Sequence, residues 1–313
     1  MEIPMRREPI PSRNLSVNLG KIRLRNPVIV ASGTFGFGEE FEDFFDLNEL
    51  GAIIPKGISL KPMAGNPPPR LFETEGGILN SIGLQNPGVD VFMKEKLPYF
   101  EKIRTPLIVN FFGTTEREYV ELARRLAESP RIEGLEMNIS CPNVRKCGVV
   151  FSTDPRMTYR LVRAVRKAVS IPLMVKLSPN VTDIAAIARS AEEGGADAVS
   201  LINTIRAMAV NIHTRRAELG NIIGGLSGPA IKPIALRMVW EVKNAVSIPV
   251  IGMGGIMKAE DAIEFLMVGA TAIQIGTANL VNPGTALAVA RGIREYLDHH
   301  GLRKVPSLLL PPA

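Results

Sequence analysis

Residues 173–202 read LMVKLSPNVTDIAAIARSAEEGGADAVSLI and contain one complete strand–helix–strand unit. Residues 173–177 and 198–202 are short apolar runs, a pattern typical of buried parallel strands. Between them, IAAIARSAEEGG repeats its apolar residues at three- and four-residue spacing, which predicts an amphipathic helix. Parallel neighbouring strands need a crossover of this kind, so the stretch indicates an α/β fold.

The same unit recurs along the chain. Further apolar runs predict strands at residues 27–31, 52–55, 107–111, 135–139, 250–253 and 272–275. Amphipathic segments lie between most of them, and Asp154-Pro155 supplies a helix cap followed by proline in the first turn. Eight units in this order predict a (β/α)8 TIM barrel. A doubly wound open sheet is the alternative, but no GxGxxG follows the first strand.

Three segments depart from the repeating unit. Residues 15–26, LSVNLGKIRLRN, alternate apolar and polar around Leu19-Gly20 and predict a hairpin that closes the bottom of the barrel. The intervals 57–105 and 203–247 are long and follow the second and sixth strands, so these insertions belong to the C-terminal face, where barrel enzymes place their chemistry. No internal repeat or linker interrupts residues 1–313, which predicts one domain.

Composition excludes several classes of protein. The chain has 313 residues and a net charge of +6, but the basic residues are dispersed and only 5% of residues are aromatic, which argues against a nucleic-acid partner. The charge suits a cleft for small anions. Cys141 and Cys147 form no disulfide framework, and the spacing of the three histidines predicts no metal site. Without an apolar run of about 18 residues, we expect no membrane association and a cytoplasmic location.

Polar side chains mark the ends of three successive predicted strands. Alternation within LIVNF, LEMNIS and LMVKLS turns Asn110, Asn138 and Lys176 into the barrel near its top. A buried amide without a partner costs about 1–3 kcal/mol, and a buried ammonium costs more. The three groups therefore either pair with one another or with Glu136, or they bind a polar ring system; three adjacent strands favour the ring.

Glycines end the last two strands. Gly254-Gly255 and Gly276-Thr277 allow backbone N–H groups to approach a phosphate. A phosphate at these glycines and a polar ring at the three middle strands could belong to one ligand of nucleotide size, and flavin mononucleotide (FMN) has these dimensions. Barrel aldolases and synthases acting on sugar phosphates remain alternatives, as does a lyase with a Schiff-base lysine at Lys56 or Lys176.

Longer motifs carry a family resemblance. Residues 56–88, KGISLKPMAGNPPPRLFETEGGILNSIGLQNPG, are followed in order by NISCPN, VKLSPN, LINT, IGGLSGPAIKP, GMGGI and IGTA. From about residue 15 to about residue 298, the chain closely resembles the dihydroorotate dehydrogenase family. The motifs look like those of class 1B, the catalytic subunit that works with an iron–sulfur flavoprotein. Fumarate-using class 1A enzymes share the cysteine of NISCPN, whereas membrane-bound class 2 enzymes use a serine base.

The resemblance implies an activity. Family members oxidise dihydroorotate to orotate in pyrimidine (UMP) biosynthesis, with hydride passing to FMN and the C5 proton to a base that corresponds to Cys141. The class 1B form implies a partner subunit with FAD and a [2Fe–2S] cluster that reduces NAD, and a homodimer core within a heterotetramer. The alternatives are class 1A, an FMN barrel acting on another dihydropyrimidine, a dihydrouridine synthase, and a binding barrel without catalysis.

The resemblance also implies site residues. The groups that match the FMN site are Ser32, Lys56, Gly57, Asn110, Asn138, Lys176, Ile202, Gly228, Gly254, Gly255, Gly276 and Thr277. Those that match the substrate site are Lys56, Asn80, Ser81, Ile82, Gly83, Leu84, Asn138, Asn203 and Thr204. The chain departs from the family pattern at Ser81, where alanine is common, and at Cys147 and Ser152, where glycine is usual.

Overall fold

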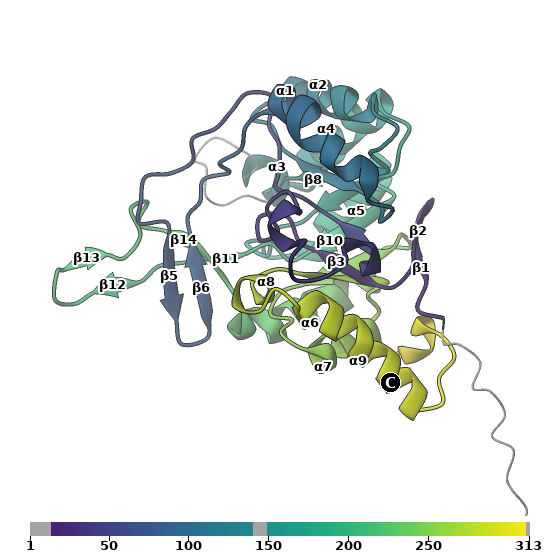
Figure 1. Cartoon of the computed structure of the whole chain (residues 1–313). Coiled ribbons are helices and arrows are strands. Elements are labelled where there is room, and N and C mark those ends of the chain that lie inside the picture. The colour runs from purple at the N-terminus through teal and green to yellow at the C-terminus, as the bar shows by residue number, and fades with distance from the viewer. Residues whose placement is uncertain (1–13, 140–148, 311–313) are drawn as a thin grey trace, which may run out of the picture.

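The computed structural model describes residues 14–139 and 149–310. Within them, eight parallel strands pair in the order β4-β3-β16-β15-β10-β9-β8-β7 (Figure 1). These strands are β3 (Val28–Val30), β4 (Ala52–Ile53), β7 (Ile108–Phe111), β8 (Gly134–Asn138), β9 (Leu173–Lys176), β10 (Ala198–Leu201), β15 (Val250–Met253) and β16 (Ala272–Ile275). A parallel bridge between Ile53 and Leu107 brings the two end strands together. The predicted strands and the predicted barrel are confirmed.

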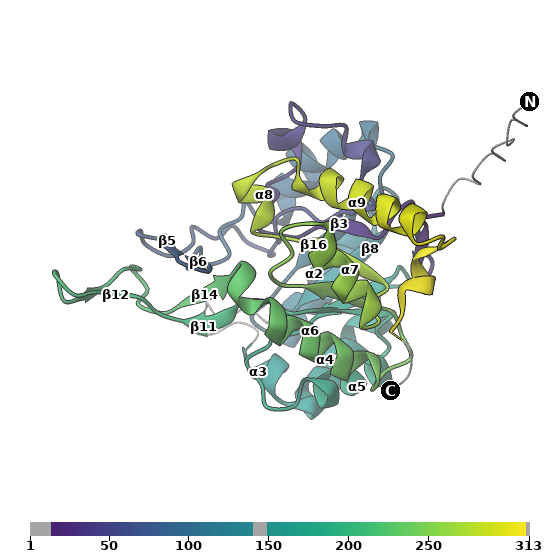
Figure 2. The same ribbon diagram turned by 90° about the horizontal axis from the view of Figure 1, so that it is seen from below.

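Helices surround this barrel (Figures 1 and 2). They are α2 (Glu116–Ala127), α4 (Pro155–Ala168), α5 (Ile184–Gly194), α6 (Lys232–Lys243), α7 (Ala259–Met267) and α9 (Thr285–His299). The predicted cap is present, because the Asp154 carboxylate accepts hydrogen bonds from the N–H groups of Arg156 and Met157 at the start of α4. Between β3 and β4, two short turns, η1 (Glu39–Phe41) and η2 (Leu47–Glu49), stand in place of a full helix.

The predicted hairpin lies at the opposite end from the insertions. Strands β1 (Val17–Leu19) and β2 (Ile22–Leu24) pair antiparallel, and Gly20 turns the chain with a φ of 57°. The Ile22 side chain is buried against Gly134, the first residue of β8. Since strands begin at the bottom of a parallel barrel, the hairpin covers that bottom, as predicted.

The two insertions build one structure. The first contributes β5 (Leu71–Thr74) and β6 (Gly77–Asn80), and the second contributes β11 (Ile205–Ala207) and β14 (Gly224–Ser227). They form a single antiparallel sheet in the order β11-β14-β6-β5. The small hairpin of β12 (Val210–Asn211) and β13 (Arg216–Ala217) extends from it, and both views show the sheet projecting on one side of the barrel (Figures 1 and 2).

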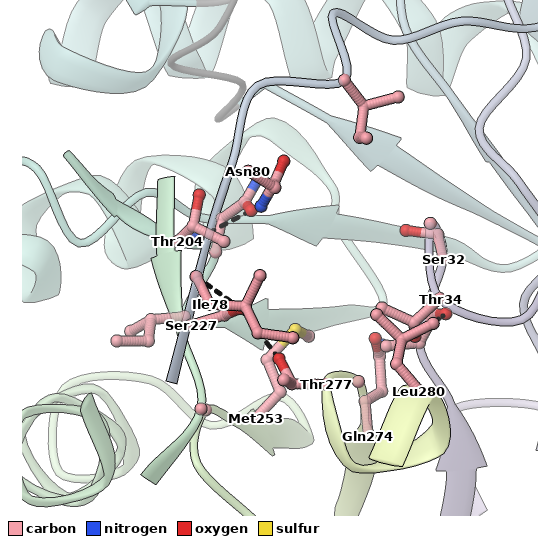
Figure 3. A pocket seen from close by; sticks show the side chains of 18 of the residues that line it. Ser32, Thr34, Ile78, Asn80, Thr204, Ser227, Met253, Gln274, Thr277 and Leu280 are labelled. Atoms are coloured by element: carbon pink, nitrogen blue, oxygen red, sulfur yellow. Dashed lines mark hydrogen bonds between the residues drawn. The ribbon is translucent and has the colours of Figure 1, made fainter. Parts of the chain in front are cut away.

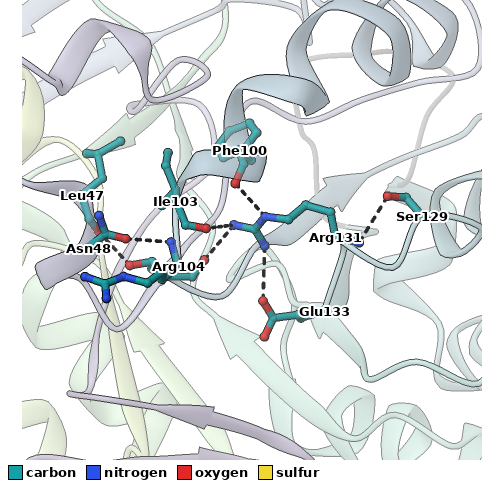
Figure 4. A network of polar contacts seen from close by, with 9 residues as sticks. Leu47, Asn48, Phe100, Ile103, Arg104, Ser129, Arg131 and Glu133 are labelled. Atoms are coloured by element: carbon teal, nitrogen blue, oxygen red, sulfur yellow. Dashed lines mark hydrogen bonds and ion pairs between the residues drawn. The ribbon is translucent and has the colours of Figure 1, made fainter.

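The first insertion returns to the barrel through three short helical segments, α1 (Val89–Val91), η3 (Phe92–Lys96) and η4 (Leu97–Lys102). Arg131 fixes the end of this path (Figure 4). Its guanidinium donates hydrogen bonds to the carbonyl oxygens of Phe100 at 2.8 Å, Ile103 at 3.0 Å and Thr105 at 2.9 Å. One side chain therefore binds three carbonyls at and just beyond the end of η4, and the Phe100 carbonyl also accepts a hydrogen bond from the Ile103 N–H at 3.0 Å.

The remaining elements are short. They are α3 (Val149–Thr153), η5 (Pro229–Ile231), α8 (Ala278–Val281) and η6 (Val305–Leu308). Of the helices in residues 14–139 and 149–310, none has the length and apolar character needed to cross a membrane.

Candidate active site

A cavity of about 320 Å³ opens at the carboxyl ends of the barrel strands, beneath the insertion sheet. Figure 3 shows Asn80 and Thr204 of the insertions on one side, and Ser32 and Thr34, which follow β3, on the other. The volume falls within the range of about 300–1,000 Å³ that is usual for small-molecule sites. Within the described residues, the predicted groups that line it are Ser32, Lys56, Gly57, Asn80, Ile82, Gly83, Leu84, Asn110, Asn138, Ile202, Asn203, Thr204, Gly228, Gly254, Gly255, Gly276 and Thr277.

Two predicted residues lie behind the cavity wall. Lys176 points inward as alternation required, but it lies 3.8 Å from the buried Glu136 carboxylate and 3.4 Å from the Ser32 hydroxyl. Ser81 is fully buried, and its hydroxyl accepts a hydrogen bond from the Asn66 amide at 2.9 Å inside the first insertion. Lys176 therefore has a partner in Glu136, and its contact with FMN stays a prediction.

A polar layer thus lies beneath the cavity floor. The Glu136 carboxylate, fully buried, also accepts hydrogen bonds from the Ser200 hydroxyl at 3.2 Å and from the Gln274 amide at 3.3 Å. A carboxylate buried without such partners would be strongly unfavourable, so this layer compensates the charges of Glu136 and Lys176 internally.

Two buried amide atoms at the cavity have no partner within the described residues. They are Nδ2 of Asn110, a donor, and Oε1 of Gln274, an acceptor. Each costs about 1–3 kcal/mol as long as it stays unpaired. A bound ring that presents both an acceptor and a donor would satisfy them. Gln274 was not predicted as a site residue. The alternation within residues 273–275, IQI, nevertheless places it on the interior face of its strand, by the same argument that placed Asn110 there.

Glycines form the far end of the cavity. Gly228, Gly254 and Gly255 have φ values of 99°, 125° and 74°, and residues with a side chain rarely adopt such positive values. A Cβ at Gly276 would make only ordinary van der Waals contact, with Ala31 at 3.8 Å and Thr34 at 3.9 Å. The backbone at these four glycines, Gly228, Gly254, Gly255 and Gly276, is called the glycine cradle below. The Thr277 hydroxyl lies beside it and forms a 2.8 Å hydrogen bond with the Ser227 hydroxyl.

Lys56 carries the cationic group of the site. It lines the cavity, and its ammonium has no hydrogen bond or ion pair within the described part of the chain. Burial, the largest cause, lowers the pKa of Lys56 from its ordinary value, although the Glu40 carboxylate acts in the opposite direction. A partly buried ammonium without an ion pair in the described residues suits an anionic ligand.

The insertions supply the wall opposite the strand ends. Asn80 pairs in register with Gly225, and its amide donates to the Gly225 carbonyl at 3.3 Å. Asn203 and Thr204 follow β10, so the second insertion begins at the cavity itself. Cys141, Cys147 and the segment around them lie outside the described residues. In the sequence, Cys141 follows Asn138, which ends β8 and lines the cavity.

The family model described as dihydroorotate dehydrogenase matches residues 14–297. The chain belongs to the dihydroorotate dehydrogenase family. The resemblance on which the sequence reading relied is confirmed, as is the prediction of an oxidoreductase, so a Schiff-base lyase is disfavoured.

Individual dihydroorotate dehydrogenases are close in sequence. A relative from Geotalea uraniireducens is 55% identical over 296 residues, which cover 95% of this chain and 97% of the relative. A relative from Pelobacter propionicus is 54% identical with the same coverage. Both are described as dihydroorotate dehydrogenase B (NAD(+)), catalytic subunit.

A solved dihydroorotate dehydrogenase supports the fold. The crystal structure of DHODH from Eimeria tenella in complex with ferulenol superposes with a TM-score of 0.79 and 23% sequence identity. The match covers 99% of this chain and 90% of the other. At this identity, the likeness concerns the barrel architecture alone.

Proposed function

We propose that this chain is the catalytic subunit of a class 1B dihydroorotate dehydrogenase, which oxidises dihydroorotate to orotate for pyrimidine biosynthesis. The observation that carries the proposal is a pair of amide atoms, on Asn110 and Gln274, that have no partner within the described residues and belong to the same cavity as Lys56 and the glycine cradle. The names of relatives at 54–55% identity support the same reaction and the class.

FMN fits the donors and acceptors of this cavity. A flavin ring offers carbonyl acceptors and an imide donor to Asn110 and Gln274, and its phosphate suits the backbone around Gly254, Gly255 and Gly276. Gly57 permits the close approach of the Asn110 amide, because a Cβ there would lie 2.5 Å from Asn110 Oδ1. When bound, FMN would accept two electrons and the hydrogen that leaves C6 of the substrate.

The substrate is a cyclic ureide with a carboxylate. We assign the Lys56 ammonium to that carboxylate, since it is the cation that lines the cavity and it forms no ion pair within the described residues. The amides of Asn80, Asn138 and Asn203 and the hydroxyl of Thr204 would bind the ureide edge. The backbone of the segment Ile82, Gly83 and Leu84 completes the wall, and Ser81 supports that segment from behind.

We assign the base to Cys141. Oxidation forms the C5–C6 double bond when the C5 proton leaves to a base and C6 loses hydrogen with its electron pair. A thiol has a reference pKa of about 8.5, so a useful thiolate fraction exists near neutral pH with modest cationic help. A base that accepts a proton from carbon needs no histidine to activate it as a nucleophile.

Electrons must then leave this subunit. We propose a partner subunit that carries FAD and a [2Fe–2S] cluster and reduces NAD, around a homodimer of this chain in the cytoplasm. The term "catalytic subunit" in the names of the relatives supports the existence of a partner. Fumarate as acceptor, in class 1A, is the alternative.

The test is anaerobic mixing of the FMN-loaded chain with dihydroorotate. We expect the flavin absorbance to bleach in a single turnover, and orotate to form in equal amount. Dihydrouracil serves as the matched control, because it lacks the carboxylate that Lys56 would bind. Bleaching by dihydrouracil as fast as by dihydroorotate would favour the other dihydropyrimidine reaction, and no bleaching by either would refute the proposal.

A further inference from the structure

An ion-pair cluster lies directly behind the glycine cradle. The Lys232 ammonium, at the first residue of α6, donates to the Asp261 carboxylate at 2.7 Å and to the Glu264 carboxylate at 2.9 Å. Asp261 and Glu264 belong to α7. The Asp261 side chain is only 9% exposed, so this contact is shielded from water to a degree that surface ion pairs are not.

Asp261 holds the cradle loop with its second oxygen. Oδ2 accepts hydrogen bonds from the N–H groups of Met257 at 2.9 Å and Lys258 at 3.1 Å. Met257 lines the cavity and ends the loop that begins at Gly254 and Gly255. Asp261 therefore fixes one end of this loop, while β15 fixes the other.

Lys232 holds the neighbouring segment. The backbone of Gly255 packs against the start of α6, since a Cβ at Gly255 would lie 2.8 Å from Lys232 Cβ and 2.9 Å from the Gly228 carbonyl oxygen. Gly228 and Ile231, which lead into α6, also line the cavity. The Lys232–Asp261 contact thus joins two of the backbone segments that meet at the cradle.

Direct attraction of a phosphate is not the task of this cluster. The hydrogen bond to Asp261 raises the pKa of Lys232, so the ammonium stays charged at neutral pH. Burial acts to raise the pKa of Asp261, but the hydrogen bonds from Lys232 and Met257 lower it overall. Two carboxylates therefore face one ammonium, and the net charge of the cluster does not favour an anion.

We propose that Lys232 and Asp261 are positioning residues, which hold the loop at residues 254–257 and the start of α6 in the spacing that binds the phosphate of FMN. The inference rests on the proposed function for the identity of the cofactor. It can be tested separately from the reaction, because riboflavin has the same ring system as FMN but no phosphate. Loss of either residue should therefore weaken the binding of FMN and not that of riboflavin.

The experiment compares the Kd values of FMN and riboflavin for the flavin-free full-length chain, measured by quenching of flavin fluorescence. We expect Asp261→Asn and Lys232→Met to weaken FMN binding by about tenfold or more, as loss of an outer-shell partner does around metal sites. Riboflavin binding should change by less than about twofold, because riboflavin has no phosphate. A tenfold rise in the Kd of FMN corresponds to a loss of about 1.4 kcal/mol of binding free energy. Lys232→Arg keeps the cation and should restore most of the preference for FMN.

Glu260→Gln is the matched control for Asp261→Asn, because it removes the same charge from an exposed neighbour in the first turn of α7. It should leave both Kd values unchanged. If Asp261→Asn does not fold, Lys232→Met decides, since it leaves the bonds from Asp261 to the loop in place.

An unchanged ratio of the two Kd values in the folded variants, including equal weakening of both flavins, would overturn the inference alone. A wild-type chain that binds FMN no better than riboflavin would also overturn it, without touching the oxidation of dihydroorotate. A wild-type chain that binds neither flavin would overturn the inference and the proposed function together.

Discussion

Asn110 shows how a single residue can oppose folding and favour binding. Its amide Nδ2 is buried without a partner in the described structure, which costs stability until a ligand accepts its hydrogen bond. Asn110→Leu should leave the flavin-free chain as stable as the wild type or more stable. The same change should weaken FMN binding by about 1–2 kcal/mol, roughly tenfold. Urea unfolding and fluorescence titration measure the two effects; a loss of stability with intact FMN affinity would contradict the assignment.

The two cysteines provide a matched pair for testing the base. Cys141→Ala should retain FMN, because no FMN contact is assigned to that side chain, but it should slow flavin reduction by dihydroorotate by about 10²–10⁴-fold. Cys147→Ala, six residues further along the chain, should reduce its flavin at the wild-type rate. Stopped-flow absorbance near neutral pH measures both rates. Equal rates in wild type and Cys141→Ala would end the assignment of Cys141.

Lys56 links the site to pH. Because burial lowers its pKa in the folded chain below its ordinary value of 10.5, the unfolded chain holds this proton more tightly. Between the folded pKa and 10.5, unfolding takes up a proton, so the Lys56 contribution to stability rises with pH across that window. Lys56→Met should therefore be more stable than the flavin-free wild type at pH 7, with an advantage that shrinks as the pH rises toward 10.5.

Urea unfolding at several pH values tests this sign. Lys56→Met should also lose affinity for orotate, because the carboxylate then has no cation to bind. A stability difference that stays constant with pH would show that burial of the charge is not its cause.

At the scale of elements, Arg131 fastens the first insertion to the barrel. Its side chain is 16% exposed and donates to three carbonyl oxygens where the first insertion returns to the barrel (Figure 4). Arg131→Ala should lower the free energy of unfolding by about 2–4 kcal/mol, since charged hydrogen bonds contribute about 1.5–3 kcal/mol each and water replaces some of them. The exposed Arg124 on α2 is the control, and Arg124→Ala should change stability by less than about 0.5 kcal/mol. Equal effects of the two substitutions would contradict this role.

The elements also differ in how far the sequence predicts them. The barrel strands follow from apolar runs such as residues 173–177, because burial on both faces selects apolar side chains at every position. The insertion sheet was not predicted, because its central pair joins Asn80 to Gly225, 145 residues apart. Its strands are short and partly exposed, so local pattern alone does not identify their partners.

At the scale of the whole molecule, the open question is the electron acceptor, which the proposed partner subunit would determine. If the class 1B proposal holds, the isolated chain loaded with FMN should reduce fumarate slowly, and the addition of an iron–sulfur flavoprotein partner should allow NAD reduction by dihydroorotate. The measurement is NADH absorbance at steady state, with and without the partner. Rapid turnover with fumarate and no gain from the partner would assign the chain to class 1A.

By itself, the sequence determined the barrel, its bottom hairpin, the two insertions and the interior direction of Asn110, Asn138 and Lys176. Strand periodicity and motif order can be recognised in the sequence without knowledge of long-range contacts. The tertiary structure alone decided that Lys176 pairs with Glu136, that Ser81 lies behind the cavity wall and that the insertions share one sheet. The alternation of side chains along a strand determines which face of the sheet a side chain lies on. Its partner is determined by the distant strand that lies opposite once the barrel closes, and the local sequence does not contain that information.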